Sequence, residues 1–159
     1  MFCTADGGAI MPAARIGTEA SVRDSLISPA SHIDGEVIRS VISPGVVIEP
    51  GAVVRDSIIQ HKCVIRAGAI VDRSILDKEV TVGRGAVIGA GEDVPNFERP
   101  DIVNAGITVI GKRVTIPAGM NVGKNVVIGP GVNEELLDRP ALESGATVQP
   151  TNMPLHLFV

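Results

Sequence analysis

Aromatic residues are almost absent from this chain, which has no Trp, no Tyr and 3 Phe among 159 residues. Basic segments are equally scarce, because no run of Lys and Arg exceeds two residues and the formal net charge is −4. Binding to nucleic acids relies on cations that neutralise phosphates and often on aromatic rings that stack on bases. The composition therefore argues against a nucleic-acid partner.

Long apolar runs and cysteines are lacking as well. No run approaches the roughly 20 residues of a membrane span, and residues 1–14 contain neither the basic segment nor the apolar stretch of a secretory signal. Two cysteines, Cys3 and Cys63, do not suggest a disulfide framework. We therefore expect a cytoplasmic protein with no membrane partner.

Aliphatic residues are abundant, and they recur with a fixed period. They follow one another in steps of six, six and five residues, so that a period of 17 is sustained from Ile42 to Ile88. This spacing suits neither an α-helix nor a simple alternating strand. It is typical of a triangular coil with a short strand on each side, stacked on the next coil. The sequence predicts an all-β fold, a single-stranded left-handed parallel β-helix of hexapeptide repeats.

The other positions of the hexad support this fold. Counting each recurring aliphatic residue as the first, the fourth is often Gly, which adopts the positive φ that tight corners require. The fifth residue is mostly small or β-branched, as a narrow interior demands, and Cys63 at this position is interpreted as a core residue.

The period is lost in two places. Residues 91–106 are expected to loop out between two coils, and residues 133–159 are expected to form an irregular tail that packs on the last coil. The resulting organisation is a linker remnant over 1–9, a β-helix domain over 10–132 and a tail over 133–159.

The sequence contains little that indicates catalysis. His32, His61 and His156 are interpreted as surface residues and are too dispersed for a metal site. The Gly-rich segments 83–89 and 106–112 resemble phosphate loops but lack the required spacing or the Ser/Thr, so they are interpreted as corners. No catalytic residue, metal ligand or cofactor is predicted for this chain. Basic residues on successive coils are candidates for binding a phosphorylated metabolite.

Three features together carry a family resemblance: four copies of the motif V-x-D/R-S-I/L-I/L or a shortened form of it, a short coil over 28–42, and the segment 106–113. The copies cover residues 22–27, 38–42, 54–59 and 71–76. With these features, residues 10–132 resemble the C-terminal β-helix domain of bacterial glucose-1-phosphate adenylyltransferase, also called ADP-glucose pyrophosphorylase.

The resemblance implies a regulatory and oligomerisation domain of an enzyme that makes ADP-glucose for glycogen synthesis. The family's N-terminal catalytic domain, which uses ATP and Mg²⁺, has no counterpart here, so no catalysis by this chain alone is expected. The implied partners are that domain, further copies in a homotetramer, and a phosphorylated sugar effector such as fructose 1,6-bisphosphate. Two basic positions of the family's effector site match this chain, one at Lys78 and the other at Lys112 or Arg113.

Alternative interpretations remain open from the residues alone. One is a stand-alone hexapeptide acyltransferase that uses CoA, which would need a His at a subunit boundary. Another is a purely structural β-helix that only oligomerises. A third is a relative that transfers a guanylyl or uridylyl group instead of an adenylyl group.

Overall fold

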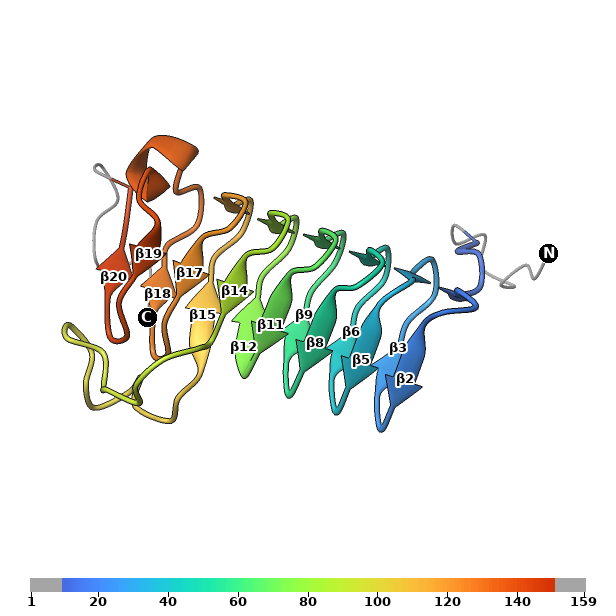
Figure 1. Cartoon of the computed structure of the whole chain (residues 1–159), viewed down its shortest axis with the longest axis horizontal. Helices are drawn as coiled ribbons and strands as arrows, with labels where there is room; N and C mark the ends of the chain where they lie inside the picture. The colour runs from blue at the N-terminus through green and yellow to red at the C-terminus, as the bar shows by residue number, and fades with distance from the viewer. Residues whose placement is uncertain (1–9, 151–159) are drawn as a thin grey trace.

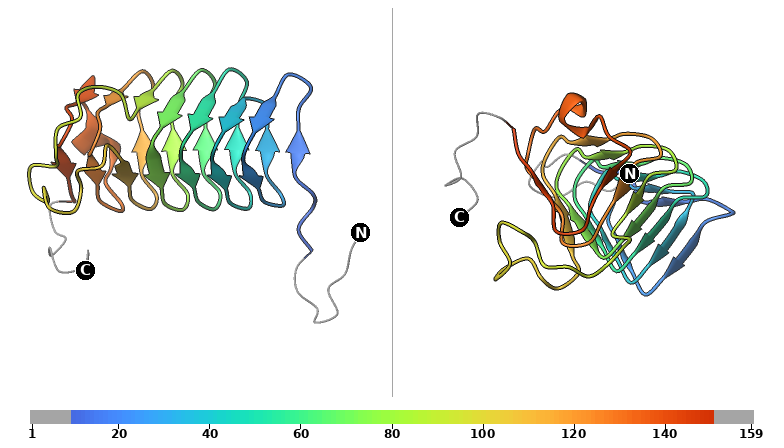
Figure 2. Two further views of the ribbon diagram at one scale, coloured as in Figure 1. Left: turned by 90° about the horizontal axis from the view of Figure 1, so that it is seen from below. Right: turned by 60° about the vertical axis from the view of Figure 1, so that its left-hand side comes forward.

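The structure, a computed structural model, describes residues 10–150. Its strands are two or three residues long and form three parallel sheets, which we name A, B and C (Figures 1 and 2). Sheet A contains β1 (Arg15–Ile16), β4 (His32–Ile33), β7 (Val47–Ile48), β10 (Val64–Ile65), β13 (Thr81–Val82) and β16 (Thr115–Ile116). Sheet B contains β2 (Ser21–Arg23), β5 (Glu36–Ile38), β8 (Val53–Arg55), β11 (Ile70–Asp72), β14 (Val87–Ile88), β17 (Asn121–Val122) and β19 (Ala141–Leu142). Sheet C contains β3 (Leu26–Ile27), β6 (Val41–Ile42), β9 (Ile58–Ile59), β12 (Ser74–Leu76), β15 (Thr108–Ile110), β18 (Val127–Ile128) and β20 (Thr147–Val148).

Each coil visits sheets A, B and C in turn and then stacks on the coil before it, which confirms the predicted parallel β-helix (Figure 2). The register repeats with the period seen in the sequence, since Val64 pairs with Val47 and with Thr81, 17 residues away on either side. We call the bends between strands the A–B, B–C and C–A corners. The fourth hexad position lies at these corners, and Gly45, Gly68 and Gly85 there all have positive φ.

The core is a column of aliphatic side chains inside the coils. All of the recurring positions from Ile42 to Ile88 are fully buried. Ile16, by contrast, is 48% exposed, because no coil among the described residues precedes its own. Burial of this column is the main stabilising contribution to the fold, at about 25 cal/mol per Å² of apolar surface.

Cys63 lies in the core as predicted, with no exposed surface, and burial raises the pKa of its thiol to about 11 from an ordinary value of 9.0. Between these two pH values the unfolded chain loses a proton that the folded chain keeps. The free energy of unfolding should therefore fall as the pH rises, by up to about 1.4 kcal/mol per pH unit from this group. Denaturant titrations at pH 9, 10 and 11 should show a shallower fall for Cys63→Val, because valine already fills the equivalent buried position in the neighbouring coils, at Val46 and Val80. Identical pH profiles for the two proteins would contradict the assignment.

Residues between β14 and β15 leave the coil stack at a B–C corner, which confirms the loop predicted over 91–106 (Figure 1). The loop folds back against the coils that follow it. Phe97 donates its backbone N–H to Gly145 O at 2.9 Å, and Asn96, which is fully buried, hydrogen-bonds Asn125 O and Thr147 Oγ1, both at 3.0 Å. The loop is thereby attached to coils that lie after it in the sequence.

The expectation of an irregular tail after residue 132 needs correction. A 3₁₀ helix, η1 (Glu134–Leu137), takes the place of a sheet A strand and packs against β16, with Leu137 fully buried. The chain then adds β19 beside β17 and β20 beside β18. The coil stack therefore continues to Val148. The predicted linker remnant 1–9, the last residues of the predicted tail and His156 lie outside the described residues.

Candidate functional site

The candidate basic residues lie on the C–A corner, where consecutive coils are joined by backbone hydrogen bonds. The Arg113 N–H donates to Lys78 O at 3.0 Å, and the Gly131 N–H donates to Lys112 O at 2.8 Å. One coil earlier, the Glu79 N–H donates to His61 O at 2.9 Å. Lys78 and Lys112 therefore occupy equivalent places on adjacent coils, about 4.8 Å apart along the stack.

This corner contains side chains at positions where the backbone favours glycine. The φ angles of Lys62, Glu79 and Arg113 are 58°, 61° and 60°, while Gly45 and Gly131 occupy the same place in other coils. A side chain in this left-handed region costs roughly 1–2 kcal/mol. Three charged residues have been kept in consecutive coils despite that cost. The B–C corner shows the same departure at Asp24, Arg39, Asp56 and Arg73, so left-handed side chains do not by themselves single out a site.

Arg113 is already engaged in an ion pair. Its Nε donates to Glu79 Oε2 at 3.0 Å, with the side chains 66% and 43% exposed. This hydrogen bond is the main reason why the pKa of Glu79 is lowered, and attraction to Lys112 and Lys62 adds to it. Among residues 10–150, Lys62, Lys78 and Lys112 have no carboxylate within 4.0 Å. The corner therefore presents three ammonium groups to solvent beside a paired arginine.

The structure thus brings Lys78, Lys112 and Arg113 together on one corner. It adds two residues that were not among the predicted site residues, Lys62 as a further cation and Glu79 as a competing anion. Their signal in the sequence is positional: both stand at the fourth hexad place, where Gly is the usual residue.

The histidines do not converge. His32 lies on the outer side of sheet A, with Nε2 3.1 Å from Asp34 Oδ2, whereas His61 is exposed on the C–A corner. Within the described part of the chain, no group of three His, Cys, Asp or Glu side chains is arranged to hold a metal ion. In the same part there is no helix long and apolar enough to cross a membrane.

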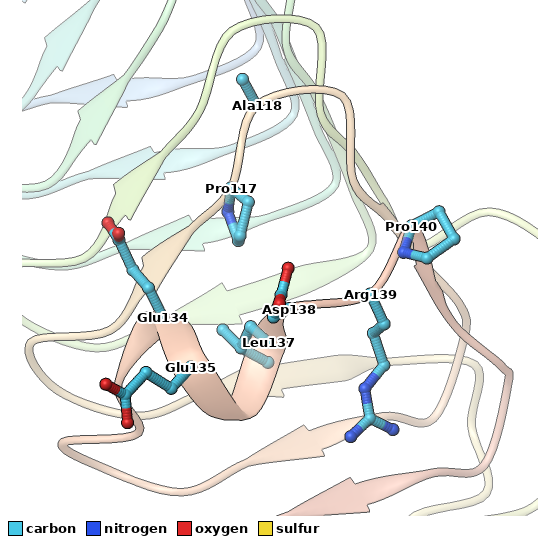
Figure 3. Close-up of a pocket in the computed structure, with 8 residues that line it drawn as sticks. All are labelled: Pro117, Ala118, Glu134, Glu135, Leu137, Asp138, Arg139 and Pro140. Atoms are coloured by element: carbon cyan, nitrogen blue, oxygen red, sulfur yellow. The ribbon is translucent and has the colours of Figure 1, made fainter.

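A spacious hollow lies elsewhere, beside η1 at the end of the stack (Figure 3). This open groove of about 630 Å³ runs between Pro117 of an A–B corner and the side chains of Glu134, Leu137 and Asp138. Its lining contains three acidic residues and one arginine but none of the predicted site residues, so it does not suit the anionic ligand that the basic corner suggests.

Comparison with known proteins relates this geometry to a family. The family described as GlmU-like, C-terminal hexapeptide, matches residues 8–110, more than half of the chain. The chain belongs to this family. Members of it share the stacked hexapeptide coils described above.

Individual proteins similar to this chain include glucose-1-phosphate adenylyltransferases of two bacteria. Glucose-1-phosphate adenylyltransferase of Thermotoga neapolitana is 49% identical over 140 residues, which is 88% of this chain and 33% of that protein. The enzyme of the same name from Acetivibrio thermocellus is 37% identical over 139 residues, 87% of this chain and 33% of the relative. The resemblance inferred from the sequence is thus confirmed, and this hexapeptide domain is homologous to the C-terminal β-helix domain of ADP-glucose pyrophosphorylases. It spans about a third of the length of these relatives.

Solved structures agree on the fold alone. The acetyltransferase domain of PglB from Neisseria gonorrhoeae has a TM-score of 0.52 and 21% identity, covering 90% of this chain and 54% of that one. A putative acetyltransferase from Desulfovibrio desulfuricans has a TM-score of 0.51 and 14% identity, covering 87% and 27%. Hexapeptide coils are common to these proteins at identities too low to carry function over.

Proposed function

We propose that this chain is the regulatory and oligomerisation domain of a cytoplasmic glucose-1-phosphate adenylyltransferase of glycogen synthesis. The reaction, ATP and glucose 1-phosphate giving ADP-glucose and pyrophosphate with Mg²⁺, takes place on a separate catalytic domain that this domain contacts. Copies of the domain assemble the tetramer, and its C–A corner binds a phosphorylated sugar effector. The observation that carries the proposal is the 37–49% identity to one third of these enzymes over most of this chain.

The charges on the corner support the effector role. Lys78 and Lys112 lie on adjacent coils without a carboxylate partner in the described residues, and Lys62 lies close enough to influence the pKa of Glu79. Ammonium groups bind phosphate by charge-assisted hydrogen bonds. A sugar bisphosphate carries one phosphate at each end, so it can engage cations on neighbouring coils at the same time. Arg113 would contribute only after exchanging Glu79 for phosphate.

The test is a calorimetric titration of the domain with fructose 1,6-bisphosphate. Removing two charge-assisted hydrogen bonds in the variant Lys78→Ala/Lys112→Ala should weaken binding at least about tenfold, since each is worth about 1.5–3 kcal/mol. The control Lys124→Ala removes a cation from a B–C corner and should leave binding unchanged. Absence of saturable binding to the unmodified domain, or an equal loss in the control, would contradict the effector site. Acetyl-CoA serves as the second ligand, and its binding would favour the acyltransferase alternative.

Two further measurements address the rest of the proposal. The domain alone should produce no ADP-glucose from ATP and glucose 1-phosphate, and measurable synthesis would overturn the assignment of catalysis to another domain. Sedimentation analysis should show self-association of the domain, and a strictly monomeric species at high concentration would remove the assembly role.

A further inference from the structure

The outer face of sheet C carries a continuous row of aliphatic side chains. In every strand of this sheet up to β18, two aliphatic residues stand next to each other, the first facing outward and the second facing the core, where it is buried in all strands except β3, whose Ile27 is partly buried. The pairing register places the outward residues in line from coil to coil. They are Leu26, Val41, Ile58, Ile75, Val109 and Val127, and we call them the sheet C row.

The row is exposed and is specific to this sheet. Leu26, Val41 and Ile58 are 70%, 40% and 43% exposed, and the other three are partly exposed. The outward positions of sheets A and B are aliphatic only over two or three coils. In sheet A, Val47 and Val64 lie between His32 and Thr81, and in sheet B, Val53, Ile70 and Val87 lie between Glu36 and Asn121. Parallel sheets have aliphatic residues on both faces where both faces are covered. The pattern therefore indicates that sheet C packs against another element.

Two hollows lie beside the row at its C-terminal end, next to β12, β15 and β18. A cavity of about 390 Å³ is lined by Ile75, Val109 and Val127, with Asp77 and Pro130 at its C–A edge. A second, of about 180 Å³, lies between Val109, Val127 and the loop, whose Ile102 and Val103 form its wall. Ile102 is itself 67% exposed. The row thus begins as an open strip and ends in two hollows with aliphatic floors, one bordered by Asp77 and the other by Glu98 and Arg99.

The dimensions of the row fit an α-helix. Five steps of about 4.8 Å give a length of about 24 Å, which about 16 helical residues span at 1.5 Å each. A strip of that length and about 10 Å wide offers on the order of 240 Å², far below the roughly 800 Å² per partner of a standard interface. A second copy of the chain would need much more surface than the row provides, whereas a helix lying in a groove needs only one apolar face.

The charges on the two sides of the row indicate which charge the flank of such a helix would carry. On the B–C side, ion pairs within the domain engage several of the charges: Arg39 binds both oxygens of Asp56 at 2.7 and 2.8 Å, and Arg55 pairs with Asp72 at 3.2 Å. On the C–A side, Lys62, Lys78 and Lys112 have no such partner in the described residues. We infer that the sheet C row is the docking site of an amphipathic helix from a partner, with an apolar face and acidic residues on the flank next to the C–A corner. This inference does not rest on effector binding.

The test uses two designed helical peptides of 18 residues as probes, with the same leucine face and with either Glu or Lys on one flank. Fluorescence anisotropy should show saturable binding of the Glu peptide, with a dissociation constant below about 100 µM. The variant Ile58→Thr/Ile75→Thr keeps β-branched residues in β9 and β12 and should weaken binding at least about tenfold. The matched control Val53→Thr/Ile70→Thr also replaces two β-branched aliphatic residues by threonine, on the outer face of sheet B in the same two coils, and should bind as the unmodified domain does.

Several outcomes would overturn the inference. They are no binding of the Glu peptide, equal losses in the two double variants, or binding of the Lys peptide as tight as that of the Glu peptide at low salt. Dimers of the domain that dissociate in Ile58→Thr/Ile75→Thr, but not in the sheet B control, would assign the row to a second copy instead. Circular dichroism of each variant shows whether it is folded before binding is measured.

Discussion

Replacing Gly83 by alanine is expected to destabilise the domain by about 3 kcal/mol or more. A Cβ at this position would stand 2.5 Å from Ala118 N and 2.7 Å from Ile116 O, both backbone atoms of the next coil. The Gly83 N–H also donates to Ile116 O at 2.8 Å, so the two coils cannot separate without losing that bond. Backbone in a stacked coil cannot yield as a flexible side chain would.

The matched control is Gly85→Ala, two residues later on the same corner. Gly85 has φ +65°, but a Cβ there meets nothing within 4 Å. Its cost is therefore limited to the left-handed conformation, roughly 1–2 kcal/mol. Guanidinium titrations followed by far-UV circular dichroism would measure both variants, since the chain has no Trp or Tyr for fluorescence. Equal midpoints for the two variants would show that contact between coils at this corner does not limit stability.

Replacing Asn96 by alanine is expected to release the loop between β14 and β15. The buried Asn96 Nδ2 donates to Asn125 O and Thr147 Oγ1, and its Oδ1 accepts the backbone N–H groups of Glu98 and Arg99 at 3.0 and 2.9 Å. Truncation leaves several of these groups unsatisfied, at about 1–3 kcal/mol each. A loss of about 2 kcal/mol raises the open population about thirtyfold.

Cleavage by chymotrypsin after Phe97, which is 66% exposed, reports this opening. The rate should rise about thirtyfold in Asn96→Ala while the loop closes faster than it is cut. Asn104→Ala is the control in the same loop, because Asn104 is exposed and makes one side-chain bond, to Pro100 O at 2.9 Å. If cleavage is equally fast in both variants, Asn96 is not what holds the loop. The same release would remove the wall formed by Ile102 and Val103 beside the sheet C row.

Much of the fold could be predicted because a hexapeptide coil is a local pattern. The spacing from Ile42 to Ile88 specified the three sides, the buried column and the break at the loop. The last coil was missed because η1 lengthens the step between Ile128 and Leu142. The step of six from Leu142 to Val148, with Gly145 at the fourth place and Ala146 at the fifth, was nevertheless present in the sequence.

The candidate site was predictable only in part. Family positions pointed to Lys78, Lys112 and Arg113, but the pairing of Arg113 with Glu79 joins residues 34 apart and depends on how the coils stack. By contrast, the period did place Ile59 in the core column and left Ile58 facing outward, as the structure shows.

The sequence by itself therefore determined the coil, its corners and the identity of the core column, because each follows from steps of five or six residues. Only the tertiary structure decided which cations lie together, which of them is already paired and that Leu26, Val41 and Ile58 form one row. The physical reason is that coils align through backbone hydrogen bonds between residues mostly 15 to 20 apart, and up to 35 apart across the loop. The loop adds its own contacts. Side chains distant in sequence become neighbours only when those bonds have formed.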